Sequence, residues 1–147
     1  MLAIAPGAYN VARQWPAEHY GAIARRFADQ GWRIWVLGGP KERGARDIIA
    51  RMAPVRDFTE ASLGEAVLQI RAADLFLGSD SGLLHVAGAV GTPSVGLFGP
   101  FPPEVSGPRN ACVARLRPPD GSVALHEIAV DEVERALLGQ ICIRRMQ

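Results

Sequence analysis

The stretch LFLGSDSGLLHVAGAVGTPSVGLFGP, residues 75–100, is the most informative part of this chain about its fold. An apolar run ends in Gly-Ser, a segment with helical spacing follows, and a second apolar run ends in Gly-Pro. Short continuous apolar runs are typical of strands in a parallel sheet whose two faces are both covered, and a helix usually connects two such strands. We therefore predict a strand, a turn at residues 80–82, a helix and a second strand, with the turn facing an anion.

The same alternation continues along the rest of the chain. Helical patterns separate the apolar runs, and Ser62 with Glu65 forms a capping box at the start of one of them. Alternating strands and helices predict one α/β domain over residues 1–147, with a parallel sheet and helices on both faces. We expect a long surface loop at 99–122, where Pro and Gly are frequent, and expect strands at 2–5, 33–39, 55–58, 75–79 and 94–99.

Composition narrows the class of protein. The chain has 147 residues, 48% of them hydrophobic, and a formal net charge of +1. These values fit a globular domain and argue against a disordered chain or a nucleic-acid-binding protein. Its two cysteines form no C-x-x-C motif, and neither a signal peptide nor an apolar run of bilayer length is visible. We expect a cytoplasmic protein that is at most peripherally bound to membranes.

Glycine-rich loops follow four of the predicted strands. Their sequences are PGAYN at 6–10, GGPKE at 38–42, SDSG at 79–82 and GPFPP at 99–103. In parallel sheets of this kind, ligands bind beyond the carboxyl ends of the strands. We therefore expect these four loops to meet at one edge of the sheet and to form one binding site.

The polar residues of these loops suit a nucleotide diphosphate. Ser81 and Gly82 begin a helix whose N–H groups and dipole favour an anion, and His85 shares a helical face with Ser81. Arg13 is a permanent cation with the geometry to contact two phosphate oxygens. Glu42 is an acceptor suited to the hydroxyl groups of a ribose. Neither a G-x-G-x-x-G nor a P-loop motif is present.

Each candidate residue also has a purely structural interpretation. Asp80 is placed to cap the helix that follows it, and His85 fits an ordinary position within that helix. Arg13 is one of many arginines in the chain and fits a solvated surface position equally well. His19 and His126 have no partners at ligand spacing, so we predict no metal site.

An enzymatic alternative comes from GSDSG at 78–82. It fits G-x-D-x-G, a version of the α/β-hydrolase nucleophile turn in which Asp80 would be the nucleophile and His126 the later histidine. That hypothesis leaves the loops at 6–16, 38–42 and 96–100 unexplained, and it needs a larger sheet than this chain provides.

The ordered set of motifs resembles the C-terminal half of the heptosyltransferase family, glycosyltransferase family 9. The resemblance covers residues 2 to about 137. It rests on PGAYNVARQWP, on VLGGPKE, on SDSGLLH with the strand end GLFGP, and on the closing segment HEIAVDEVERAL. Several motifs in one order are far more specific than any one of them.

The resemblance implies a Rossmann-like fold similar to the C-terminal domain of a GT-B glycosyltransferase. That domain binds a nucleotide-sugar donor, ADP-heptose in the best-known members, and the sugar passes with inversion to a lipopolysaccharide core acceptor. The family's phosphate-binding Lys falls on Arg13, and its acidic residue near the ribose falls at about Glu42. The family signature falls on Asp80, Ser81, Gly82 and His85.

Three departures from the family pattern concern the site. Arg13 stands where the family has Lys, and Phe101 stands where many members have Thr. A cysteine cluster common after that position is reduced to Cys112. Arg for Lys keeps the charge but changes its shape.

The resemblance also implies an N-terminal acceptor domain that holds the general base, and these residues do not include it. We therefore assign no catalytic residue, cofactor or metal to the chain. We expect a donor-binding domain that binds nucleotide but transfers no sugar alone. The alternative is a nucleotide- or sugar-phosphate-binding module without catalysis.

Overall fold

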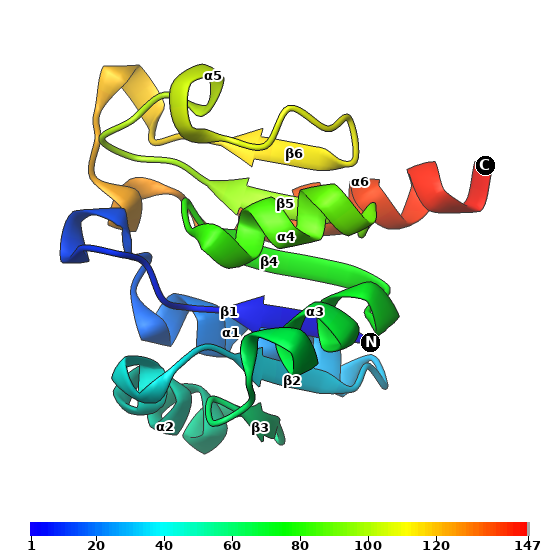
Figure 1. Ribbon diagram of the computed structural model, residues 1–147. Coiled ribbons are helices and arrows are strands. Elements are labelled where there is room, and N and C mark those ends of the chain that lie inside the picture. The colour runs from blue at the N-terminus through cyan, green and yellow to red at the C-terminus, as the bar shows by residue number, and fades with distance from the viewer. Residues whose placement is uncertain (147) are drawn as a thin grey trace.

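The computed structural model describes residues 1–146, which form a parallel six-stranded sheet with helices on both faces (Figure 1). The prediction of a Rossmann-like α/β fold is confirmed. The strand order is β3-β2-β1-β4-β5-β6, so the chain moves to one side of β1 first and then returns to add β4 on the other. The strands are β1 (Leu2–Ala5), β2 (Ile34–Leu37), β3 (Arg56–Phe58), β4 (Leu75–Ser79), β5 (Ser94–Leu97) and β6 (Val113–Leu116).

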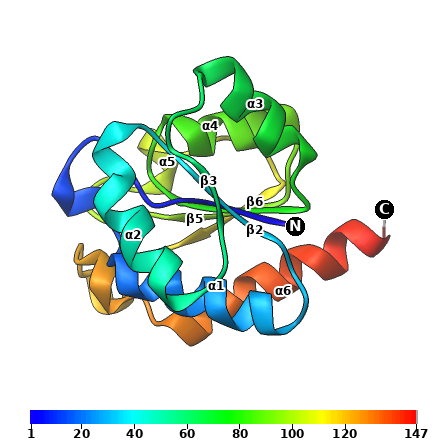
Figure 2. The same ribbon diagram turned by 90° about the horizontal axis from the view of Figure 1, so that it is seen from below.

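The helices divide into two layers (Figure 2). One layer holds α1 (Ala17–Asp29), α2 (Arg43–Met52) and α6 (Val130–Met146), and the other holds α3 (Leu63–Ala72) and α4 (Gly82–Val90). Side chains of β1 alternate between the two faces of the sheet: Leu2 and Ile4 pack with the first layer, while Ala3 and Ala5 pack with the second. The short helices are η1 (Val11–Arg13), η2 (Pro40–Glu42), α5 (Pro103–Ser106), η3 (Pro119–Gly121) and η4 (Leu125–Glu127).

Most predicted elements are found close to their expected ends. The capping box of α3 is present: the Glu65 N–H donates to Ser62 Oγ at 3.2 Å, and the Ser62 N–H donates to Glu65 Oε2 at 2.7 Å. The expectation of a long surface loop at 99–122 is wrong, because this segment contains α5 and the edge strand β6. Strand β6 has only four residues, VARL, and pairs in parallel with β5. Its position is therefore set by pairing with a neighbour distant in sequence, which a four-residue pattern among Pro and Gly does not reveal.

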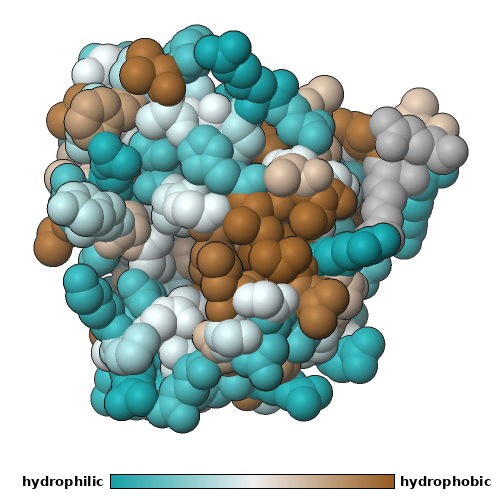
Figure 3. Space-filling model, in the orientation of Figure 1, coloured by the Kyte–Doolittle hydropathy of each residue, from teal (hydrophilic) through white to brown (hydrophobic). Residues whose placement is uncertain are grey.

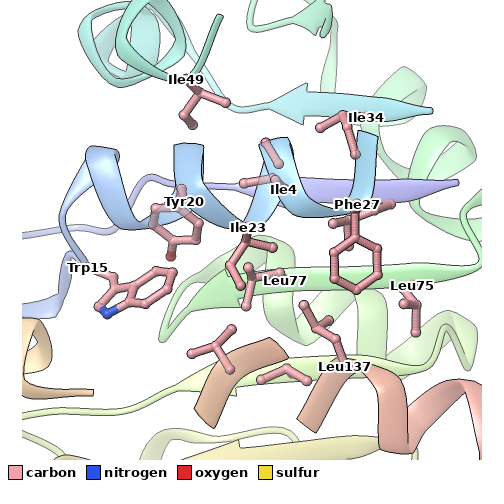
Figure 4. Packing of buried hydrophobic residues seen from close by; sticks show 14 of the residues in the cluster. Ile4, Trp15, Tyr20, Ile23, Phe27, Ile34, Ile49, Leu75, Leu77 and Leu137 are labelled. Atoms are coloured by element: carbon pink, nitrogen blue, oxygen red, sulfur yellow. The ribbon is translucent and has the colours of Figure 1, made fainter. Parts of the chain in front are cut away.

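A packed aromatic and aliphatic core supports the edge of the sheet that carries the predicted site (Figure 4). Trp15 is buried, packs edge-to-face on Tyr20, and donates its indole N–H to the Ile128 carbonyl at 3.1 Å. The Tyr20 hydroxyl shares a buried hydrogen bond of 2.8 Å with the hydroxyl of Ser79, the last residue of β4. Burial raises the pKa of Tyr20 well above its ordinary value. Helix α1 is thus joined to the end of β4, just before the turn at residues 80–82.

The surface seen in Figure 3 carries an apolar area over α3 and α4, surrounded by more hydrophilic residues. On α4, Leu83, Val86 and Val90 are partly buried against the core beneath them. Within residues 1–146, no helix combines the length and the hydropathy that crossing a bilayer requires.

Candidate functional site

A pocket of about 840 Å³ lies beyond the carboxyl ends of the strands and is lined by all six residues that the sequence singled out. It adjoins β1 and β4, where the strand order changes direction, which is the usual ligand position in such sheets. Loops after β1, β2 and β4 contribute to it, as expected, whereas the fourth expected loop, residues 99–103, does not line it. The six residues are Arg13, Glu42, Asp80, Ser81, Gly82 and His85.

Arg13 is held beside the pocket by two neighbours. It ends η1, after β1, and its side chain is only 24% exposed. Its Nη1 lies 3.5 Å from Asp80 Oδ2, and its guanidinium carbon lies 4.3 Å from the centroid of the Phe101 ring. Arg13 Nε is buried and has no hydrogen-bond partner among the described residues. This arrangement differs from a solvated surface arginine, and it leaves the Nε donor of Arg13 unpaired beside the pocket.

Asp80 does not cap α4, because the residue at the N-cap is Ser81. The Asp80 side chain is 6% exposed. Its Oδ2 accepts a hydrogen bond of 2.7 Å from Ser106 Oγ and also forms the ion pair with Arg13. The capping interpretation of Asp80 is therefore wrong. In this structure its carboxylate links the turn after β4 to η1 and α5.

The start of α4 presents polar groups to the pocket. Ser81 has extended backbone geometry, and its side chain makes no capping hydrogen bond to the helix. Ser81 Oγ is buried and, in the part of the chain that is described, has no hydrogen-bond partner. Gly82 begins the helix, and His85, which is exposed, lines the same pocket one turn later. Ser81 and the N-terminus of α4 thus line one pocket, an arrangement that suits an anion.

Glu42 connects two of the loops. Its Oε2 accepts a hydrogen bond of 2.6 Å from the Gly39 N–H, so one carboxylate oxygen has a partner within its own loop. The backbone of Gly7, in the loop after β1, lies so close that a Cβ there would overlap the Glu42 carboxyl group. Glycine at residue 7 is therefore required for this contact. The predicted contact of Glu42 with a ribose stays a prediction.

Sequence reasoning missed three further contributions to the pocket. Lys41 lies in GGPKE and lines the pocket, and its positive charge in a predicted binding loop could have identified it as a candidate phosphate contact. Ser106 lies in the segment expected to be a loop, and residues 61–63 follow the weakly patterned strand β3. No motif in the sequence marks Ser106, and the capping box at Ser62 marks the start of a helix but not a binding site.

The hydrolase hypothesis finds little support in this geometry. His126 is exposed in η4 and is not among the residues that line the pocket beside Asp80. Asp80 Oδ2 is already engaged by Ser106 and Arg13, and the sheet pairs in parallel throughout the described residues. Over the same residues, no group of three His, Cys, Asp or Glu side chains is arranged to hold a metal ion.

Comparisons with known proteins identify a family and agree with the fold. The profile of glycosyltransferase family 9 (heptosyltransferase) matches residues 1–120. The chain is 31% identical to lipopolysaccharide heptosyltransferase 2 of Escherichia coli (strain K12), over 96% of this chain and 45% of that protein. It is also 31% identical to lipooligosaccharide heptosyltransferase 2 of Haemophilus influenzae, over 79% of this chain and 36% of that protein.

Among solved structures, the Escherichia coli ADP-heptose lipopolysaccharide heptosyltransferase II superposes with a TM-score of 0.89 at 28% identity, over 99% of this chain and 47% of that one. The chain thus spans about half the length of the relatives it matches, and it corresponds to their C-terminal half. Since the profile match, the identities and the fold all agree, this chain belongs to glycosyltransferase family 9, the heptosyltransferases.

Proposed function

We propose that this chain is the donor-binding part of a heptosyltransferase and holds the diphosphate of ADP-heptose or a closely related nucleotide sugar. The acceptor is a lipopolysaccharide core, to which the full enzyme transfers the sugar with inversion. The names of the relatives support this class of reaction. The superposed Escherichia coli protein is an ADP-heptose heptosyltransferase, which supports this donor.

One observation carries the proposal. Of the three buried side-chain polar atoms that lack a partner among the described residues, two, Arg13 Nε and Ser81 Oγ, belong to residues lining the same pocket. An unpaired buried polar group costs about 1–3 kcal/mol, so a fold retains such groups where a ligand pairs with them. Arginine and a hydroxyl beside a helix N-terminus are donors suited to phosphate oxygens.

These residues would act on the leaving group. In the transfer, an acceptor oxygen forms a bond to the anomeric carbon while the bond from that carbon to the diphosphate oxygen breaks. Negative charge then develops on the diphosphate, where Arg13, Ser81 and the α4 N-terminus would stabilise it. The acceptor's proton goes to a general base, which we expect outside residues 1–147.

Calorimetric titration with ADP tests the proposal. A charge-assisted hydrogen bond contributes about 1.5–3 kcal/mol, so Arg13→Ala should weaken ADP binding by about ten- to a hundredfold. The control is Arg25→Ala, since Arg25 is 61% exposed, pairs with Asp29 on α1 and lies outside the pocket. Equal ADP affinity in the wild-type chain and in a folded Arg13→Ala variant would refute the proposed phosphate contact.

A nucleotide-binding module without catalysis is the second candidate, because every predicted site residue lines the pocket and we assign none of them a catalytic role. The two functions differ in whether the full protein transfers a sugar to an acceptor. The cytoplasmic location and peripheral membrane contact also stay predictions.

A further inference from the structure

Two residues of the segment after β5 contact the charged pair in the pocket, although neither belongs to the predicted site. Phe101 is 41% exposed and lies just before α5, and Ser106 is the last residue of that helix. Pro103, between them, is buried, which anchors the segment to the body of the domain. The segment therefore brings an aromatic ring and a hydroxyl to defined positions beside η1.

The contacts converge on Arg13 from two sides. The Phe101 ring lies beneath its guanidinium, with 4.3 Å from Cζ to the ring centroid. Asp80 Oδ2 lies 3.5 Å from Nη1, and this same oxygen accepts the 2.7 Å hydrogen bond from Ser106 Oγ. Ser106 thus fixes the carboxylate, and the carboxylate and the ring together fix the arginine.

The ion pair leaves the arginine able to bind a ligand. At 3.5 Å the contact between Arg13 and Asp80 is longer than a good charge-assisted hydrogen bond. Nε has no partner within the described residues. The guanidinium is held in place while part of its donor capacity remains free.

We propose that Phe101 and Ser106 are positioning residues that orient Arg13 toward the diphosphate before the nucleotide binds. This inference rests on the proposed function. A long arginine side chain loses rotamer freedom when it binds a ligand, and holding it beforehand removes that cost from binding. A planar guanidinium can lie over a ring and face a carboxylate edge-on at once, whereas an ammonium has no planar face. Phe101 thus accounts for arginine at a position where the resemblance implies lysine.

The test is calorimetric titration of ADP into single and paired variants. Phe101→Ala and Phe101→Leu should each weaken ADP binding about three- to tenfold, because both remove the ring, whereas Phe101→Tyr should bind like the wild type. Ser106→Ala should weaken binding about two- to fivefold, and Ser106→Thr, which keeps the hydroxyl, should restore it.

Pairing each substitution with Arg13→Ala separates positioning from a general structural effect. If Phe101 and Ser106 act through Arg13, their substitutions should change ADP affinity less than about twofold once Arg13 is alanine. Thermal unfolding of every variant without ADP checks that the fold is intact.

The outcomes distinguish the inference from the function on which it rests. If Arg13→Ala binds ADP like the wild type, the proposed phosphate contact fails, and the inference fails with it. If Arg13→Ala weakens binding but Phe101→Ala, Phe101→Leu and Ser106→Ala do not, only the inference is overturned. The inference is also overturned if the Phe101 and Ser106 substitutions weaken ADP binding as much in the Arg13→Ala variant as in the wild type.

Discussion

Because the Ser81 hydroxyl is unpaired, its removal should affect ADP affinity and fold stability differently. Its Oγ is buried without a partner in the described structure and caps no helix. Ser81→Ala removes that unsatisfied group, so the free energy of unfolding without ligand should stay equal or rise by about 1 kcal/mol. ADP affinity should fall by about fivefold or more, because a donor to phosphate is lost.

Urea unfolding and ADP calorimetry on the same Ser81→Ala sample check this prediction. Ser62→Ala is the matched control, because the Ser62 side chain does cap its helix. Its loss should cost about 1 kcal/mol of stability. A Ser81→Ala variant as destabilised as Ser62→Ala would show that the Ser81 hydroxyl is structural.

Gly7 determines where the Glu42 carboxylate lies. A methyl group at this position would overlap that carboxylate, so Gly7→Ala should displace Glu42 from the pocket wall. If Glu42 accepts from the ribose, ADP binding should weaken by about tenfold, and the preference for ADP over 2′-deoxy-ADP should disappear.

The matched control for Gly7 is Gly44→Ala, since a Cβ at Gly44 in α2 meets nothing within 4 Å. This change should raise stability by about 0.5–1 kcal/mol and leave both nucleotide affinities unchanged. Should Gly7→Ala keep full affinity and full preference for ADP, the ribose contact would be excluded.

At the scale of elements, one buried hydrogen bond joins α1 to the end of β4. Tyr20 and Ser79 are both fully buried and share this bond at 2.8 Å. Tyr20→Phe leaves the Ser79 hydroxyl unpaired and should lower the free energy of unfolding by about 1–3 kcal/mol. Tyr9→Phe is the control, because Tyr9 is 95% exposed and the change should have no effect on stability.

The burial of Tyr20 makes the stability of the fold depend on alkaline pH. Burial raises the pKa of Tyr20 in the folded protein, whereas an unfolded tyrosine ionises near pH 10. Below about pH 10 both states hold the proton, and stability is unaffected. Above it, the unfolded state binds fewer protons, so the wild type should lose about 1.4 kcal/mol per pH unit relative to Tyr20→Phe. Urea unfolding of both proteins from about pH 8 to 11 measures this loss. A difference in free energy of unfolding that stays constant over this range would contradict the prediction.

At the scale of the whole molecule, residues 1–147 should bind ADP but should transfer no sugar to an acceptor. At about one hundred times its Kd, ADP should stabilise the chain by about 2.7 kcal/mol and raise the Tm by about 5–10 °C. With ADP-heptose and a lipopolysaccharide-core acceptor, residues 1–147 should form no heptosylated product, because transfer needs a base within reach of the acceptor hydroxyl. Full-length Escherichia coli lipopolysaccharide heptosyltransferase 2 is the positive control for this mass-spectrometric assay. Turnover by residues 1–147 would place the base among them.

The alternation of strands and helices, the start of α3, and the pocket loops after β1, β2 and β4 follow from the sequence alone. These features depend on local patterns: apolar runs, a capping box and glycines at strand ends. Arg13, Glu42 and the residues at 80–82 were identifiable because their chemistry follows closely after a predicted strand.

The strand order, the presence of β6 and the neighbours of Arg13 depend on the folded structure and are not visible in the sequence. Strand β6 exists because it pairs with β5, and Phe101 contacts Arg13 although the two lie far apart in the sequence. Ser106 likewise reaches Asp80 from 26 positions away. Such contacts arise when the folded sheet brings loops together, and no local periodicity or propensity records which side chains will then meet.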